Sequence, residues 1–338
     1  MMGADAEHMK QRALGRTGLT VSAIGLGCMG LSQGYGQVDD DESIRVIHHA
    51  LDLGITMLDT AMSYGAGHNE HLIARAMSGR RRDQVTLASK LIGIVRDEHG
   101  VRLDGRPENV AGYCDAALTR LGVEVIDLFY LHRVDPAVPL ADTVGAMSEL
   151  VRAGKVRHLG LSEVTAEQLQ QAAAVHPIAA VQFEWSLLWR EAEDALVPTA
   201  QRLGVGLVPY SPLGRGLLSA RLTADDIDTS EFRRTDARFH GEHLTTNARQ
   251  VDTLRELAGE LGVTPAQLAL AWLLGQGPDV VPIPGTRHVE RLIENTAAVN
   301  VALDRTQLQR LGRVSYVVSQ MMMLRRTAPP RKMMASLS

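Results

Sequence analysis

The sequence is poor in cysteine, in aromatic residues and in excess charge of either sign. Its two cysteines, Cys28 and Cys114, lie far apart, so neither a disulfide framework nor a metal site is expected. Aromatic residues make up 4% of the chain, which gives no sign of a large stacking pocket for a steroid-like ligand. The 35 basic residues against 39 acidic ones leave a net charge of −4, so no basic field favours nucleic acid or an anionic membrane.

Long hydrophobic runs and an apolar leader are also missing. No stretch approaches about 18 uninterrupted apolar residues, the length typical of a membrane span. The N-terminus, MMGADAEHMKQR, has no apolar signal region. We therefore expect a cytoplasmic protein without a membrane partner. Hydrophobic residues make up 45% of the chain and charged residues 22%, which is enough apolar material for a sizeable core.

Short apolar runs alternate with longer amphipathic ones, the pattern of a parallel sheet with helical crossovers. A β-hairpin is predicted from Arg12 to Val21, turning through Gly15–Gly18. Eight strands are predicted after it, at Ala23–Gly27, Thr56–Asp59, Val85–Lys90, Ile126–His132, Val156–Ser162, Ala180–Phe183, Val205–Tyr210 and Val280–Pro284. Helices are predicted between them at Glu42–Leu53, Glu70–Met77, Glu108–Leu121, Leu140–Ala153, Ala166–Val175, Glu193–Leu203 and Ala266–Leu274.

Eight strand–helix units without a composition break favour a single-domain (β/α)8 TIM barrel over residues 1–312, with the hairpin closing the barrel bottom. A doubly wound sheet split into two domains is less economical. Thr165 with Gln168 fits a capping box, and Thr264–Pro265 fits an N-cap followed by proline. Four glycines follow helical runs, where left-handed C-terminal caps are expected: Gly54, Gly122, Gly154 and Gly204.

Two segments interrupt this rhythm, one from Gly214 to about Thr246 and one beyond Gly312. Both are expected near the barrel mouth if they carry specificity, and on the surface as variable loops otherwise; the sequence leaves the two readings open. The tail, residues 313–338, is methionine-rich and basic, and we expect it to be poorly ordered.

Three consecutive predicted strands end in ionisable residues, namely Asp59, Lys90 and His132, and Tyr64 follows shortly after Asp59. In a (β/α)8 barrel the carboxyl ends of the strands meet at one mouth. Any one of these residues alone is explained as well by a buried ion pair or a core histidine. Three in register beside a tyrosine favour a catalytic cluster.

The four residue types suit protonation of an oxygen that becomes an alkoxide. Free tyrosine, with a pKa near ~10, is a poor acid at neutral pH, and a nearby lysine would lower that pKa. Asp59 can keep Lys90 charged in a partly dry site. A neutral His132 can hydrogen-bond a substrate oxygen and fix its position.

The segment after the last predicted strand, IPGTRHVERLIEN, suggests a turn and a helix start. Helix N-termini bind phosphate, and barrels often place phosphate after strands seven and eight. Arg287 and Arg291 are four residues apart, so they can share one helical face. Two guanidinium groups there would suit an adenosine 2′-phosphate and favour NADPH over NADH. The alternative is a solvated Arg/Glu helix face.

Asp59, Tyr64, Lys90 and His132 resemble the catalytic tetrad of the aldo-keto reductases in type, order and local context. The segments LDTAMSYGAGHNE, YLHRVD, GKVRHLGLSE and PYSPLGRG are similar to motifs of that family, and the resemblance runs from RALGRTGLTVSAIGLGCMG to IPGTRHVERLIEN. It implies that Tyr64 is the general acid, that Lys90 lowers its pKa, that Asp59 holds Lys90 and that His132 orients a carbonyl. It also implies NADPH/NADP+ as cofactor and a small-molecule carbonyl compound as substrate.

The resemblance also implies a set of cofactor contacts. For the nicotinamide end they are Met29, Asp59, Ser162, Gln182 and Tyr210, with Tyr210 stacking on the ring and Ser162 and Gln182 binding the carboxamide. For the pyrophosphate they are Ser211, Leu213 and Arg215; for the 2′-phosphate, Gly285, Thr286, Arg287 and Arg291; for the adenine, Glu294 and Asn295. One position departs from the family. Many relatives carry asparagine after the serine, whereas Glu163 stands here, and a carboxylate does not donate as an amide does.

The glycines Gly25, Gly27 and Gly30 spell G-x-G-x-x-G, but the polar, glycine-bearing LSQGYGQVDD follows instead of a helix, so we reject a Rossmann interpretation. We expect these glycines to let backbone approach the cofactor. Carbonyl reduction is the leading hypothesis. A Schiff-base aldolase using Lys90 and a nucleotide-sensing regulatory module on the same fold are the alternatives. The physiological substrate and the oligomeric state are not readable from the sequence.

Overall fold

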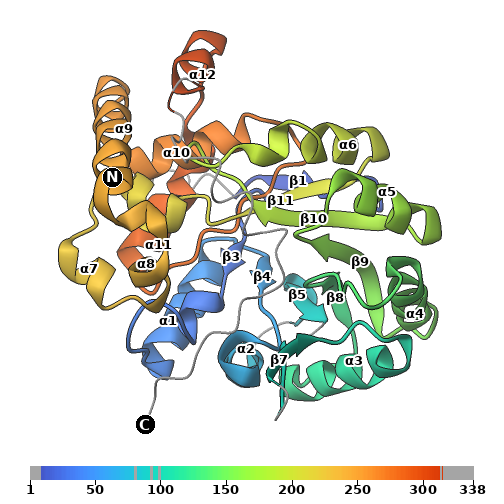
Figure 1. The fold of residues 1–338 in the computed structure, drawn as a ribbon. Helices are drawn as coiled ribbons and strands as arrows, with labels where there is room; N and C mark the ends of the chain where they lie inside the picture. The colour runs from blue at the N-terminus through green and yellow to red at the C-terminus, as the bar shows by residue number, and fades with distance from the viewer. Residues whose placement is uncertain (1–8, 80–81, 92–93, 98–99, 313, 315–338) are drawn as a thin grey trace, which may run out of the picture.

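The computed structural model describes residues 9–79, 82–91, 94–97, 100–312 and 314. The predicted tail therefore lies outside the described residues except for Val314. Seven parallel strands form one curved sheet in the order β11-β10-β9-β8-β5-β4-β3 (Figure 1). They are β3 Leu26–Gly27, β4 Met57–Asp59, β5 Thr86–Leu91, β8 Ile126–Leu131, β9 Val156–Ser162, β10 Ile178–Glu184 and β11 Gly206–Tyr210. The order follows the chain, as successive βα units round a barrel do.

The gap between β11 and β3 is closed by the predicted eighth strand, residues 280–284. On one side the Val281 N–H donates to the Leu207 carbonyl at 2.8 Å, and on the other the Gly25 N–H donates to the Pro282 carbonyl at 3.0 Å. The two prolines of this segment have no N–H to donate back to β3, so the hydrogen bonds on that side run in one direction. On the other side the segment forms one isolated bridge with β11, at Val280. The predicted (β/α)8 barrel is confirmed.

The predicted hairpin consists of β1 Gln11–Ala13 and β2 Thr20–Ser22, paired antiparallel. Its turn packs against the beginnings of β10 and β11, where the Arg16 N–H donates to the Gly204 carbonyl at 2.8 Å. Gly15 lies at φ 72, and a Cβ there would come within 2.7 Å of the Ala179 carbonyl oxygen. Only glycine fits both constraints. The hairpin therefore covers the barrel end opposite the carboxyl ends of the strands, as predicted.

The predicted helices are all present. They are α1 Asp40–Asp52, α2 His68–Met77, α3 Pro107–Leu121, α4 Leu140–Arg152, α5 Ala166–Val175, α6 Leu196–Leu203 and α10 Pro265–Leu274. The capping box at Thr165 and the N-cap at Thr264 are confirmed, and Gly54, Gly122, Gly154 and Gly204 all have positive φ. The predicted start at Glu193 is wrong: a short turn, η4 Glu191–Glu193, precedes α6. Pro198 explains the later start, because proline is tolerated only in the first turn of a helix.

Several elements were not predicted. The segment from Gly214 contains η5 Gly214–Ser219, α7 Ala224–Asp228, α8 Glu231–Thr235, η6 Ala237–Phe239 and the start of α9 Gly241–Glu260. The remaining ones are η1 Met29–Leu31, η2 Tyr64–Gly67, η3 Arg82–Gln84, β6 Ile94–Asp97, β7 Gly100–Leu103, η7 Ala298–Asn300 and α12 Arg305–Leu311. The helix start predicted after the last strand is confirmed as α11 Val289–Ala297. The 20-residue α9 was missed because it is mostly polar and buries only a few side chains. The Ser230 hydroxyl donates to the Gly34 carbonyl at 2.9 Å, which places this segment, hereafter the insertion, beside the loop after β3 at the barrel mouth.

Apolar side chains fill both the barrel interior and the layer between sheet and helices. Leu14, Met57 and Leu128 belong to the interior cluster, and all three are fully buried. Over the described ranges, no single helix is long and apolar enough to cross a membrane. α9 and α10 meet that test only as a pair, on length and composition, across a bend of 87°.

Candidate active site

The four residues expected to form a catalytic cluster come from adjacent strand ends. Asp59 is the last residue of β4, Lys90 lies at the end of β5, and His132 follows β8 with its N–H donating to the Leu91 carbonyl at 2.9 Å. Tyr64 opens η2 in the loop after β4. Since β4, β5 and β8 are neighbours in the sheet, their carboxyl ends bring these side chains to one place.

Lys90 is at the centre of the cluster and its side chain is fully buried. Its Nζ lies 2.5 Å from Asp59 Oδ1, 2.7 Å from the Thr60 carbonyl oxygen and 3.2 Å from the Tyr64 hydroxyl. These three partners use all three N–H bonds of an ammonium group. Burial by itself would lower the pKa of Lys90, but Asp59 and then Tyr64 outweigh burial and raise it. Lys90 is therefore a charged group held in a dry site by a carboxylate.

The pKa of Tyr64 differs from the prediction. We expected Lys90 to bring it below the ordinary value; instead burial raises it, and the ammonium only partly opposes that effect. Only 9% of Tyr64 is exposed. Ionising a phenol that is buried away from water is unfavourable, because the phenolate loses its hydration. The predicted decrease in the Tyr64 pKa left out this effect of burial. Tyr64 is consequently protonated at neutral pH and faces a cation through its oxygen.

His132 is a neutral imidazole. Burial lowers its pKa well below the ordinary value, and Lys90 and Arg133 lower it further. Its ring meets that of Tyr64 edge to face, with centroids 6.0 Å apart, and its Nδ1 lies 3.4 Å from the Ser63 hydroxyl. A neutral ring can donate or accept a hydrogen bond, which is what positioning a carbonyl oxygen requires.

The residues expected to bind a carboxamide lie on the next strands. Ser162 and Gln182 pair in register across β9 and β10, and both are buried. The Gln182 Nε2 donates to Asp59 Oδ2 at 2.8 Å, so Asp59 is held from both sides. Arg133 donates to the Ser162 hydroxyl at 3.3 Å. Arg133 was not among the residues predicted from the sequence, although its place directly after His132 at a strand end was a usable signal.

The residues expected to bind the 2′-phosphate lie before and within α11. The expectation that Arg287 and Arg291 share one helical face is wrong, because the helix begins at Val289 and Arg287 precedes its N-cap. Arg287 donates to the Gln37 carbonyl at 2.6 Å and also to the Tyr35 carbonyl, so it ties this region to the loop after β3. Burial lowers the pKa of Arg287, and the charge of Arg291 lowers it further. Two guanidinium groups close enough to repel each other make a donor set that suits an anion.

The neighbouring residues have partners of their own. Thr286 accepts a hydrogen bond from the His288 N–H at 3.1 Å, while Gly285 is exposed at the surface. Glu294 is bound by both nitrogens of Arg221, at 2.8 and 3.0 Å. Asn295 lies on the buried face of α11.

The residues expected near the pyrophosphate and ring follow β11 and β3. Ser211 and Arg215 both have left-handed backbone, with φ 47 and 56. The Arg215 guanidinium lies 5.4 Å from the centroid of the Phe232 ring, so it packs within the insertion. Leu213 and Met29 are half-buried.

The comparison with known proteins identifies the family. The profile of the Aldo/keto reductase family matches residues 23–315. The chain belongs to the aldo/keto reductase family. The "Probable aldo-keto reductase 1" of Glycine max is 42% identical over 299 residues, which cover 88% of this chain and 86% of that relative.

Three solved structures are similar. The glycerol dehydrogenase of Gluconobacter oxydans has a TM-score of 0.79 and 25% identity, covering 99% of this chain and 100% of its own. The holo form of a Bacillus halodurans aldo-keto reductase has a TM-score of 0.75 and 27% identity, covering 92% and 98%. A thermostable aldo-keto reductase in complex with the inhibitor epalrestat has a TM-score of 0.73 and 30% identity, covering 90% and 100%. Membership in the aldo/keto reductases supports an oxidoreductase that uses a nicotinamide nucleotide.

Two glycines of this aldo/keto reductase lie where segments of the barrel wall come close together. A Cβ on Gly27 would lie 2.6 Å from the Ile283 carbonyl oxygen, and a Cβ on Gly285 would lie 2.7 Å from the Gly27 carbonyl oxygen. The close approach is therefore between two segments of the barrel wall. Barrel closure therefore requires glycine at Gly27, and the approach of these glycines to a cofactor stays a prediction.

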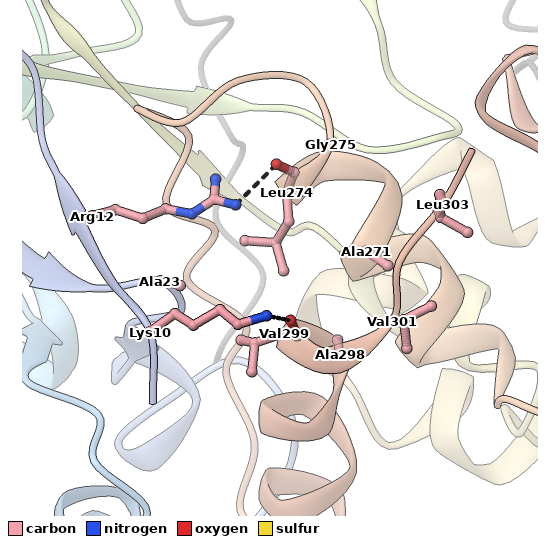
Figure 2. A pocket seen from close by; sticks show the side chains of 10 residues that line it. All are labelled: Lys10, Arg12, Ala23, Ala271, Leu274, Gly275, Ala298, Val299, Val301 and Leu303. Carbon is pink, nitrogen blue, oxygen red and sulfur yellow. Dashed lines mark hydrogen bonds between the residues drawn. The ribbon is translucent and has the colours of Figure 1, made fainter. Parts of the chain in front are cut away.

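A pocket lies beside β1 of the hairpin and the end of α10 (Figure 2). It measures about 170 Å³ and is bordered by Lys10 and Arg12 beside apolar side chains. The Arg12 guanidinium donates to the Leu274 carbonyl at the end of α10, at 3.0 Å, and Lys10 donates to the Val299 carbonyl at 3.0 Å. Both cations therefore have backbone carbonyl partners at α10 and η7.

Proposed function

We propose that this aldo/keto reductase reduces an aldehyde or ketone to the alcohol with NADPH, with Tyr64 as the proton donor. The carrying observation is the buried ammonium of Lys90, held 2.5 Å from Asp59 and 3.2 Å from the Tyr64 hydroxyl. A protonated phenol against a fixed positive charge can deliver its proton to a nearby oxygen as that oxygen gains electrons. The ammonium then stabilises the phenolate that is left.

The other two residues serve this proton transfer. Asp59 keeps Lys90 charged and is itself held by Gln182 at 2.8 Å. Neutral His132, edge to face with Tyr64, would hold the substrate oxygen near the phenol. The arrangement needs no side chain other than Tyr64 to change its protonation state during the proton transfer.

The residues present fit a nicotinamide dinucleotide phosphate. The pair Arg287 and Arg291 suits the 2′-phosphate, and the partly buried Tyr210 at the end of β11 suits a planar ring. Bound NADPH would supply the hydride. We propose as its ligands the residues named from the sequence: Met29, Asp59, Ser162, Gln182, Tyr210, Ser211, Leu213, Arg215, Gly285, Thr286, Arg287, Arg291, Glu294 and Asn295.

The Schiff-base aldolase is not supported. Its nucleophile must be a neutral amine, whereas Lys90 donates to three acceptors and its pKa is raised. No separate observation favours a nucleotide-sensing module over an enzyme.

Tyr64→Phe tests the proposal, because it removes the acid and keeps the ring. We expect carbonyl reduction to fall by about a hundredfold or more, while NADPH still binds. NADPH consumption with simple aldehydes gives the rate, and quenching of protein fluorescence gives the binding. Tyr113→Phe is the matched control. Tyr113 lies on α3, away from the cluster, and its hydroxyl donates a hydrogen bond to Asp104. Near wild-type turnover by Tyr64→Phe would remove Tyr64 from this role.

A further inference from the structure

Glu163 has an unusual backbone conformation beside the candidate site. It follows Ser162, the last residue of β9, and lies in the left-handed region at φ 55. Glutamate is not among the residues that adopt this region readily, so the surrounding contacts must hold it there. Its N–H donates to the Gln182 carbonyl at 2.9 Å, which continues the β9–β10 ladder past the end of the strand.

The Glu163 side chain reaches across two strand ends. Its Oε1 accepts a hydrogen bond from the Tyr210 hydroxyl at 2.9 Å and one from the Glu184 N–H at 3.3 Å. Burial raises the pKa of Tyr210 well above the ordinary value, and Glu163 and Glu184 raise it further, so the phenol remains a donor. Because β9, β10 and β11 are adjacent (Figure 1), one carboxylate links all three ends.

Tyr210 has one polar anchor point at the far end of its ring. Its backbone pairs with Glu184 in the β10–β11 ladder, and its ring packs against the interior apolar cluster. Apolar contacts are not directional, whereas a hydrogen bond to the hydroxyl fixes where the ring points. The Glu163 side chain is long enough to reach the Tyr210 hydroxyl and accept this directional hydrogen bond.

We propose that Glu163 is a positioning residue that holds the Tyr210 ring as a platform for the nicotinamide. This inference rests on the proposed function for the nicotinamide, but the contact that it describes exists without any ligand. The property of Glu163 that matters in this proposal is the length of its side chain and not its negative charge. The side chain must be long enough to bring an acceptor oxygen to the Tyr210 hydroxyl.

Two substitutions separate reach from charge. Glu163→Gln keeps the length and an acceptor oxygen but removes the charge, whereas Glu163→Asp keeps the charge and shortens the reach. We expect kcat with NADPH to stay within about threefold for Glu163→Gln and to fall by about tenfold for Glu163→Asp, the loss of one hydrogen bond to a charged group. Tyr210→Phe should lose a similar factor, and adding it to Glu163→Asp should cost little more. Recovery by the aspartate and not by the glutamine would overturn the proposal.

Glu163→Gly distinguishes the proposed positioning of Tyr210 from a purely structural role of Glu163 in the fold. Glycine relieves the left-handed backbone, so Tm should stay equal or rise while kcat falls as in Glu163→Asp. Full activity in this variant would also overturn the proposal.

The anchoring is measured without cofactor by ¹⁹F NMR of fluorotyrosine-labelled protein, with the Tyr210 signal assigned by its loss in Tyr210→Phe. That signal should be unchanged in Glu163→Gln and shifted in Glu163→Asp. An unmoved signal in Glu163→Asp refutes the anchoring. A shifted signal in a protein that reduces no carbonyl compound would instead count against the proposed function.

Discussion

Lys90→Met tests how strongly the buried ion pair supports this fold. The substitution keeps most of the side-chain volume and leaves Asp59, with 3% of its side chain exposed, facing an apolar group instead of an ammonium. Removing one partner of a buried pair costs about 3–5 kcal/mol. Asp59 keeps its hydrogen bond from Gln182, so the lower end, about 3 kcal/mol, is expected. That is a large share of a total stability of about 5–15 kcal/mol.

The assay is urea unfolding followed by circular dichroism, compared at constant m-value. Adding Asp59→Asn to Lys90→Met removes the unpaired charge, so the double variant should be more stable than Lys90→Met alone. Arg45→Met is the matched control. Its pair with Glu42 is 65% exposed on both sides, so it should cost less than about 1 kcal/mol.

The stability of Lys90→Met should also depend on pH with a known sign. Burial raises the pKa of Asp59, and the charge of Lys90 partly opposes this rise. In Lys90→Met that opposing charge is gone, so the pKa of Asp59 should rise further. A carboxyl group whose folded pKa is raised stabilises the fold at low pH and loses that contribution as the pH rises through the raised value. The variant should therefore be less stable at pH 8 than at about pH 5. A loss below about 1 kcal/mol, or equal stability at both pH values, would refute the reasoning.

Three further predictions follow from the same structure. Arg287→Ala should weaken NADPH binding by about tenfold or more and NADH binding far less, measured by fluorescence titration; an equal loss for both would refute the 2′-phosphate assignment. The pKa of His132 is lowered well below 6.5, so its contribution to stability is complete above pH 6.5 and is lost as the pH falls toward the lowered value. Unfolding curves of His132→Asn should thus show a weaker loss in acid than the unsubstituted protein, and parallel curves would contradict this. Gly15→Ala should lower the free energy of unfolding by about 1 kcal/mol or more beyond the effect of Gly18→Ala, as measured by chemical denaturation. Both glycines have positive φ, but only a Cβ on Gly15 would meet backbone, at 2.7 Å. Equal losses would show that the hairpin turn can move to make room.

Much of the barrel could be predicted because its signals are local. Apolar runs, capping residues and glycines after helices act within a few residues, and they placed α5 at Ala166–Val175 as predicted. Where a local rule was overlooked, as with Pro198 in α6, the boundary was wrong by a few residues. α9 was missed for a different reason: its buried face is narrow, and only packing against the barrel shows which side it is.

Local patterns were enough to predict the strand–helix alternation. They also placed a carboxylate, an ammonium group and an imidazole at the ends of predicted strands, with a phenol shortly after the first. Only the tertiary structure shows how far these side chains are buried away from water. That burial raises the pKa of Tyr64 above the ordinary value, whereas a neighbouring lysine in water would lower it. The tertiary structure also decided that Gly27 faces Ile283 of the closing strand and that Glu163 reaches Tyr210 on the second strand along. The physical reason is the same in each case. Desolvation and contact depend on atoms far away in the chain, which no local pattern encodes.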